Sequence, residues 1–194
     1  MSDINISVDG GTTKRLLTAG KYCESDIVVT ASGGGDDGSF KSVLEGTAVK
    51  PTLPSDLTKI RQYGFYPCYQ LALTSLPDGV TEIGREAFYS CSHLALASLP
   101  SSLESIGSYA FYACTSLALT SIPASVKIIG SSAFSACTKL ESITFEGTPT
   151  SISSGVFSAC NNLVTLNVPW AEGAVANAPW GASKATINYN YTGA

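Results

Sequence analysis

The sequence predicts an α/β solenoid, a coil of about five units with a parallel sheet along one face. The main observation is that particular residue types recur every 23 positions across the middle of the chain. The phenylalanine column comprises Phe65, Phe88, Phe111, Phe134 and Phe157, and the cysteine column comprises Cys68, Cys91, Cys114, Cys137 and Cys160. Three further columns share the same register, and one of them holds Ile60, Ile83, Ile106, Ile129 and Ile152. A period of 23 is typical of leucine-rich repeats.

The second observation is that each unit has two halves. The segment LALTSLP (71–77) alternates apolar and small residues and stops at proline, which predicts a short strand. In IGSYAFYAC (106–114), Ile106, Ala110 and Cys114 share one face of a short helix or helical turn. One unit cannot bury its own apolar side, whereas stacked units can, so we expect the columns to become ladders in the core.

The cysteine column admits a metal-binding, a disulfide, a nucleophilic and a structural interpretation. No CxxC motif occurs and the chain has 1 histidine, which argues against zinc. Packed helices lie about 8–10 Å apart, too far for disulfides between adjacent helix-borne cysteines. We therefore expect the five thiols, and Cys23 outside the register, to be small buried filler.

The motif LPDGVTEIGREAFYSCSHL (76–94) resembles the BspA-like leucine-rich repeat family, and the resemblance covers about residues 41–168. It implies right-handed α/β solenoids, found in bacterial surface proteins and adhesins that bind host proteins. It implies no catalytic residues. The segments Ile6–Ala31 and Asn167–Gly193 resemble parts of bacteriophage and prophage tail or structural proteins.

These features divide the chain into four parts. We expect a small β module with a possible attachment role at 1–32, a glycine-rich linker at 33–40, the solenoid at 41–168 and a C-terminal β cap at 169–194. Ile4, Ile6 and Val8 alternate before an Asp-Gly-Gly turn, and residues 26–30 form another candidate strand. In the cap, residues 186–191 should add a closing edge strand, and Trp170 and Trp180 should cover the end of the core; stacking on a sugar is their alternative role.

Composition narrows the choice of partners. Charged residues are 13% of the chain and the net charge is −4, so we expect no nucleic-acid binding. No window approaches 18 consecutive apolar residues, so we expect no membrane insertion. The first residues lack the basic and apolar regions of a secretion signal, which indicates a protein made in the bacterial cytoplasm unless a signal was removed.

The sequence predicts no enzyme and no cofactor. His93 is the single histidine, and no phosphate-binding or zinc-protease motif is present. The candidate binding surface is instead aromatic and contains Tyr63, Tyr66, Tyr89, Tyr109 and Tyr112. Such a row suits protein or glycan contacts, although the rings could simply pack between units. The strand face should be smooth and uncharged, with Ala72, Thr74, Ala95, Ala97, Ala118 and Thr120 pointing outward.

Two functions therefore compete. The first is a phage or prophage virion protein, in the tail, fibre or baseplate, that presents a recognition surface to a protein or glycan receptor or to other virion proteins. The second is a bacterial cell-surface adhesin, which would require an export signal. An intracellular scaffold is a third option. A homo-oligomer could form through the N-terminal module or the strand face.

Overall fold

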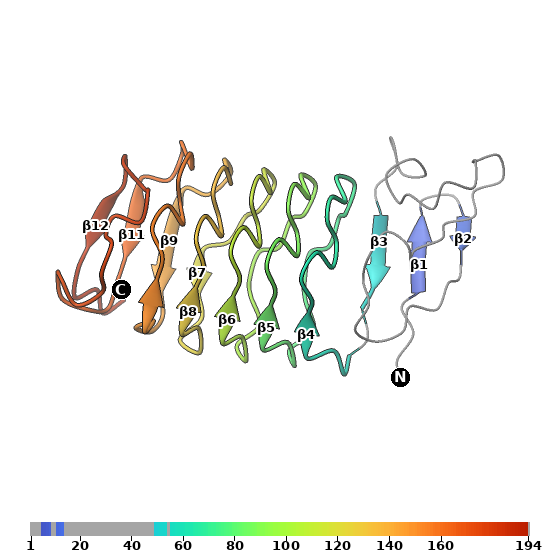
Figure 1. Cartoon of the computed structure of the whole chain (residues 1–194), viewed down its shortest axis with the longest axis horizontal. Coiled ribbons are helices and arrows are strands. Elements are labelled where there is room, and N and C mark those ends of the chain that lie inside the picture. Colours follow the sequence, from blue (N-terminus) through green and yellow to red (C-terminus); the bar gives the residue numbers. More distant parts are fainter. Residues whose placement is uncertain (1–4, 9–10, 14–48, 54, 194) are drawn as a thin grey trace.

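The computed structural model describes residues 5–8, 11–13, 49–53 and 55–193 of the chain. These residues form a rod of stacked coils with a small sheet at the N-terminal end (Figure 1). The small sheet is antiparallel with the order β2-β1-β3, and its strands are β1 (Asn5–Val8), β2 (Gly11–Thr13) and β3 (Val49–Thr52). The hairpin of β1 and β2 lies within the predicted N-terminal β module, whereas β3 comes from residues predicted to lie in the solenoid. The predicted strand at 26–30, the linker and Cys23 lie outside the described residues.

The solenoid is built on two parallel sheets rather than the one that the sequence predicts. The first runs along the rod in the order β10-β8-β6-β5-β4. Its strands are β4 (Lys59–Ile60), β5 (Glu82–Ile83), β6 (Ser105–Ile106), β8 (Ile128–Ile129) and β10 (Ser151–Ile152), and each begins one of coils one to five. In every one of these strands the column isoleucine is buried.

The second sheet has the order β12-β11-β9-β7 and is confined to the C-terminal half of the rod. Its strands are β7 (Ser121–Ile122), β9 (Ser142–Phe145), β11 (Thr165–Asn167) and β12 (Thr186–Asn188). β12 pairs in parallel with β11 and closes a sixth, shorter coil, which confirms the predicted edge strand.

The segment 71–77 does not form the regular strand that its sequence predicts. Leu71 and Leu73 are buried with Ala72 between them, but Thr74 and Ser75 are both exposed before Leu76 returns to the core. Regular strands alternate their side chains between two faces. The three-residue step from buried Leu73 to buried Leu76 breaks this alternation. In β9 the step is two residues, from Ile143 to Phe145, and a four-residue strand results.

The predicted helical half of each unit is also wrong, because the described residues contain no helix. The chain makes successive four-residue β-turns instead; for example, the N–H of Cys68 donates to the carbonyl of Phe65, three residues earlier, at 2.8 Å. Other N–H groups reach the next coil, as from Phe88 to the carbonyl of Ala110 at 2.8 Å. Paired strands lie about 4.8 Å apart, whereas packed helices need about 8–10 Å, so a helix in every coil would require the stack to curve. Turns fit the strand spacing directly.

The core is a set of ladders that run the length of the solenoid. Neighbouring phenylalanine rings of the column stack with centroids 5.2 Å apart for Phe65 and Phe88, and 5.7 Å apart for Phe134 and Phe157. All five phenylalanines and the five column cysteines are buried. The predicted leucine-rich repeat stack of 23-residue units is therefore confirmed, with turns in place of helices.

Candidate functional site

Three tyrosines form a stacked row on the outside of the turns. Tyr66, Tyr89 and Tyr112 follow the column phenylalanines in coils one to three, so the coil spacing brings their rings together. The ring centroids of Tyr66 and Tyr89 lie 5.1 Å apart, and those of Tyr89 and Tyr112 lie 4.8 Å apart at an interplanar angle of 12°. Aromatic pairs at such separations stabilise one another beyond the area that they bury.

Tyr63 and Tyr109 extend this row sideways. Tyr63 meets Tyr66 edge-on with ring centroids 5.7 Å apart, and Tyr109 meets Tyr112 with ring centroids 5.9 Å apart. The structure thus joins all five predicted tyrosines into one continuous group, which we call the tyrosine cluster: Tyr63, Tyr66, Tyr89, Tyr109 and Tyr112.

The tyrosine cluster both packs between coils and faces solvent. Tyr63 is 41% exposed and Tyr66 is 38% exposed, whereas Tyr89 and Tyr112 are half-buried between neighbouring rings. Burial raises the pKa of the Tyr89 phenol, and the neighbouring Tyr112 and Tyr66 raise it further. The Tyr89 phenol therefore keeps its proton at physiological pH and can donate a hydrogen bond to a partner.

One exposed aromatic side chain near this surface, Tyr69, was not predicted from the sequence. Tyr69 is 41% exposed and follows Cys68 in coil one. Its 23-residue column continues as Ser92, Thr115, Thr138 and Asn161, so no aromatic column marks it. The proximity of Tyr69 to Tyr89 is visible only in the folded chain, where its charge influences the Tyr89 pKa.

A charged pair lies between the outer tyrosines. Glu86 occupies the same column as Tyr63 and Tyr109, in the coil between them. Its carboxylate oxygen lies 2.8 Å from the Arg85 side-chain Nε. The Glu86 carboxylate raises the pKa of Arg85, which remains a cation. An ion pair with an exposed guanidinium thus lies within the group of aromatic rings.

The cysteine ladder is structural, but the thiols do more than fill space. Each of Cys91, Cys114, Cys137 and Cys160 donates through Sγ to the carbonyl of a phenylalanine in the preceding coil, at 3.0 to 3.2 Å. The same carbonyl accepts the N–H of the cysteine in its own coil, as Phe88 does from Cys91 at 3.1 Å. Each thiol thereby links two coils through one buried carbonyl.

These four thiols form no disulfide and are poor nucleophiles. Burial raises the pKa of Cys91 to about 12 and that of Cys160 to about 11, so the reactive thiolate is suppressed. The helix-spacing argument against disulfides does not apply, because the segment is not helical, but these thiols form none. Within the described residues, no group of histidine, cysteine and acidic side chains could hold a metal ion.

His93 does not form a catalytic arrangement with its neighbour Ser92. Its Nδ1 lies 3.3 Å from the Ser92 Oγ but 2.8 Å from the carbonyl oxygen of Tyr69. A carbonyl can only accept, so Nδ1 carries the proton and cannot act as the base for the serine. The imidazole is exposed on the polar side of the coil, as its column predicts.

The two tryptophans cap the end of the core, as predicted. Trp180 is 0% exposed and donates through Nε1 to the Ala176 carbonyl at 2.7 Å. Trp170 is also buried, and its ring meets Phe145 edge-on with centroids 5.2 Å apart. Neither indole face is open to solvent for stacking on a sugar, so the alternative role is wrong.

The predicted strand face is partly exposed, although it lacks a regular strand in coils one and two. Thr74, Ala97 and Thr120 are exposed, and Ala72, Ala95 and Ala118 are half-buried.

No helix in the described part of the chain has the length and apolarity to cross a bilayer.

The stacked coils, the buried ladders and the exposed side chains on the turns define a leucine-rich repeat solenoid, a binding or structural repeat module. Residues 40–172 match the family described as the BspA type leucine-rich repeat region, in 6 copies. The chain belongs to this family, which is typically non-catalytic. The match ends at residue 172, before β12, so most of the coil that β12 closes lies outside it.

Two solved leucine-rich repeat proteins are similar to this chain. One, from T. pallidum, is 40% identical with a TM-score of 0.51, and the match covers 60% of this chain and 56% of that chain. The other, from Bacteroides ovatus ATCC 8483, is 31% identical with a TM-score of 0.49, and the match covers 61% of this chain and 30% of that one. The similarity thus spans less than two thirds of either solved chain. No curated protein sequence matches this chain significantly.

Proposed function

We propose that this chain is a non-catalytic recognition protein whose tyrosine cluster binds a protein or glycan receptor. The observation that carries the proposal is the continuous group of five tyrosine rings on the turns of coils one to three. Tyrosine is enriched at binding hot spots because it combines a large rigid contact area with one hydrogen-bonding hydroxyl. Because each ring already contacts a neighbouring ring of the cluster, less side-chain entropy remains to be lost on binding.

We further propose that the protein is a component of a phage or prophage virion. This rests on the resemblance of Ile6–Ala31 and Asn167–Gly193 to segments of phage tail proteins. In this proposal the N-terminal module attaches the protein, and the solenoid presents the tyrosine cluster to a receptor. Mass spectrometry of purified virions tests the location, and virions that lack the protein while their host produces it would exclude it.

A cell-surface adhesin is the second candidate. It is favoured by the resemblance of residues 41–168 to the BspA-like family, which implies bacterial surface proteins and adhesins. Protease treatment of intact cells distinguishes the adhesin from the virion protein, because only a protein on the cell surface is cleaved while the cells remain intact.

The binding role is tested by replacing Tyr63 and Tyr66 with serine. Serine fits the backbone of both columns, because Ser132 and Ser135 occupy the equivalent positions in coil four. Against host cell-envelope proteins and a glycan array, the double variant should bind at least about tenfold more weakly than the wild type. Val164→Ser, which alters an apolar side chain that is 55% exposed outside the cluster, is the matched control. Equal binding by both variants would refute the role of the cluster.

A further inference from the structure

The C-terminal end of the solenoid presents an open sheet edge. β12 is the last strand of the four-stranded sheet and pairs with β11 on one side. Among the described residues, no strand pairs with its other side. Such an edge is a template for a strand from another chain, and proteins usually blunt it with charge or proline. The β12 sequence Thr-Ile-Asn contains neither.

The backbone of β12 has hydrogen-bonding groups that point away from β11. The Thr186 N–H donates to the Val164 carbonyl at 2.9 Å, and the Val168 N–H donates to the Asn188 carbonyl at 3.0 Å. In a parallel ladder, alternate residues direct both backbone groups to the same neighbour. Thr186 and Asn188 therefore face β11, and the N–H and carbonyl of Ile187 face the open side.

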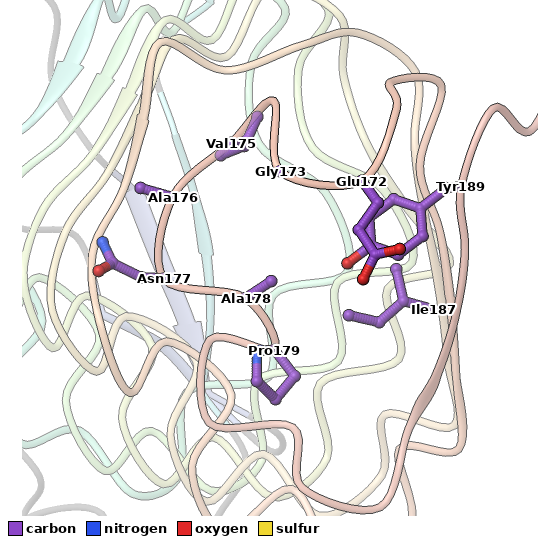
Figure 2. Close-up of a pocket in the computed structure, with 9 residues that line it drawn as sticks. All are labelled: Glu172, Gly173, Val175, Ala176, Asn177, Ala178, Pro179, Ile187 and Tyr189. Atoms are coloured by element: carbon purple, nitrogen blue, oxygen red, sulfur yellow. The ribbon is translucent and has the colours of Figure 1, made fainter.

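A pocket of about 450 Å³ lies beside this edge. Ile187 and Tyr189 line it on one side, and the loop that contains residues 172–179 surrounds the rest. Figure 2 shows the loop curving around the opening, with Glu172 and Tyr189 on the same side as Ile187. Its size falls within the range of specific ligand sites.

The lining of the pocket favours a cationic side chain with an apolar stem. Glu172 is the one charged residue among those that line it, and no lysine, arginine or histidine does so. Tyr189 offers an aromatic ring, on which a cation can be stabilised, and Val175 and Pro179 offer apolar surface. The Asn177 amide, which could have served an anion, instead donates to the Ile152 carbonyl at 3.0 Å.

We propose that this end of the solenoid binds an extended peptide that carries a lysine or arginine. The peptide adds to β12 as a further strand, through the outward N–H and carbonyl of Ile187. Its cationic side chain enters the pocket and pairs with Glu172 across the Tyr189 ring. Backbone pairing then supplies affinity for any extended segment, and the pocket supplies the choice of side chain.

The side-chain preference is tested with fluorescein-labelled heptapeptides of sequence Thr-Val-Thr-X-Thr-Val-Thr, in which X is Lys, Arg, Gln or Glu. Fluorescence anisotropy with the full chain should give dissociation constants at least about fivefold lower for Lys and Arg than for Gln, with Glu weakest. Equal binding of all four peptides, or no binding of any below about 1 mM, would overturn the proposal.

The strand pairing is tested with N-methylated versions of the lysine peptide. One version carries N-methyl groups on residues 2, 4 and 6, and the other on residues 3 and 5. Because only alternate residues of an added strand face β12, one version should lose binding and the other should keep it within about twofold. Two methylated peptides that both bind as well as the parent would exclude strand addition.

Matched protein variants locate the cation. Glu172→Gln should reduce the preference for Lys over Gln by about fivefold, because it removes the charge and keeps the shape. Glu104→Gln neutralises an exposed carboxylate in a distant coil and should leave the preference unchanged. Tyr66→Ser should not affect peptide binding, so this test is independent of the tyrosine cluster. An unaltered preference in Glu172→Gln would contradict the assigned pocket.

Discussion

Coils one to three and coils four to six share one interior but differ on two outer faces. On the turns, the column of Tyr66, Tyr89 and Tyr112 changes to Ser135 and Ser158 from coil four onward. On the second face, coils one and two have no regular strand, whereas β9, β11 and β12 form a parallel sheet in the later coils. The N-terminal half thus carries the tyrosine column on its outer face, and the C-terminal half has more backbone hydrogen bonds between strands.

The difference shows that the buried ladders fit the coil spacing set by strand pairing and leave the outer columns free to vary. The phenylalanine stack passes through both halves with centroids 5.2 to 5.7 Å apart. The outer column can vary because its contacts between coils, which are ring contacts for tyrosine and the Ser135–Ser158 bond for serine, add to the buried ladders and do not replace them. A repeat module can therefore acquire a binding surface on a few coils without changing its core.

The largest expected effect comes from breaking the shared interior. Phe111→Ala in the N-terminal half and Phe157→Ala in the C-terminal half should each lower the free energy of unfolding by about 3–5 kcal/mol, because both rings are fully buried. Urea denaturation measures the change. A loss below about 1 kcal/mol at only one of the two sites would show that the halves do not share one core.

Glycine 107 tests how closely the earlier coils approach. A Cβ on Gly107 would lie 2.5 Å from the backbone N of Arg85, so Gly107→Ala must push two coils apart. We expect a loss of about 2–4 kcal/mol in urea denaturation. Ser153 holds the same column in coil five, so this crowding is a property of the earlier coils. Gly79→Ala is the control, since its Cβ would come no closer than 3.5 Å to the Leu57 carbonyl; equal losses would contradict the expectation.

Alkaline pH should weaken both halves through the buried thiols. Cys91 keeps its proton in the folded state up to about pH 12, whereas an ordinary thiol loses it near 9.0. Between these values the unfolded state binds fewer protons, so the free energy of unfolding falls as pH rises, by about 1.4 kcal/mol per pH unit for one thiol. Cys160, with a pKa of about 11, should contribute over a narrower range.

The measurement is the pH dependence of urea unfolding from pH 9 to 12 in the wild type and in Cys91→Ala. The variant should have a shallower slope over that whole range. A Cys160→Ala variant should have a shallower slope only up to about pH 11. Identical slopes in the wild type and Cys91→Ala would mean that the thiol titrates normally in the fold.

The smallest expected effect comes from extending the tyrosine row into the later coils. Ser135→Tyr places a ring next to Tyr112 on a backbone that already accepts tyrosine in three coils. It removes the bond from the Ser135 Oγ to the Ser158 carbonyl, 3.0 Å long, and adds an aromatic contact. These effects oppose each other, so the free energy of unfolding should change by less than about 1 kcal/mol. A loss above about 2 kcal/mol would show that the turn of coil four differs from that of coil three.

The candidate site could be predicted in part. Tyr66, Tyr89 and Tyr112 are visible as a column, and Tyr63 and Tyr109 lie three residues before two of them. Tyr69 has no aromatic counterpart in its column, and the pocket beside β12 joins residues 172–179 to residues 187 and 189 through the last coil. No periodicity connects those segments, so neither Tyr69 nor the pocket could be predicted from the sequence.

The sequence by itself determined the repeat, its register and the residues of the core, because each coil must offer its neighbour the same buried shape. Only the tertiary structure decided the backbone of the turns. The spacing of Ile106, Ala110 and Cys114 fits a helix in isolation, but these segments hydrogen-bond to the adjacent coils instead. Strand pairing fixes those coils about 4.8 Å apart, a spacing that the turns fit directly, whereas helices would need about 8–10 Å and a curved stack.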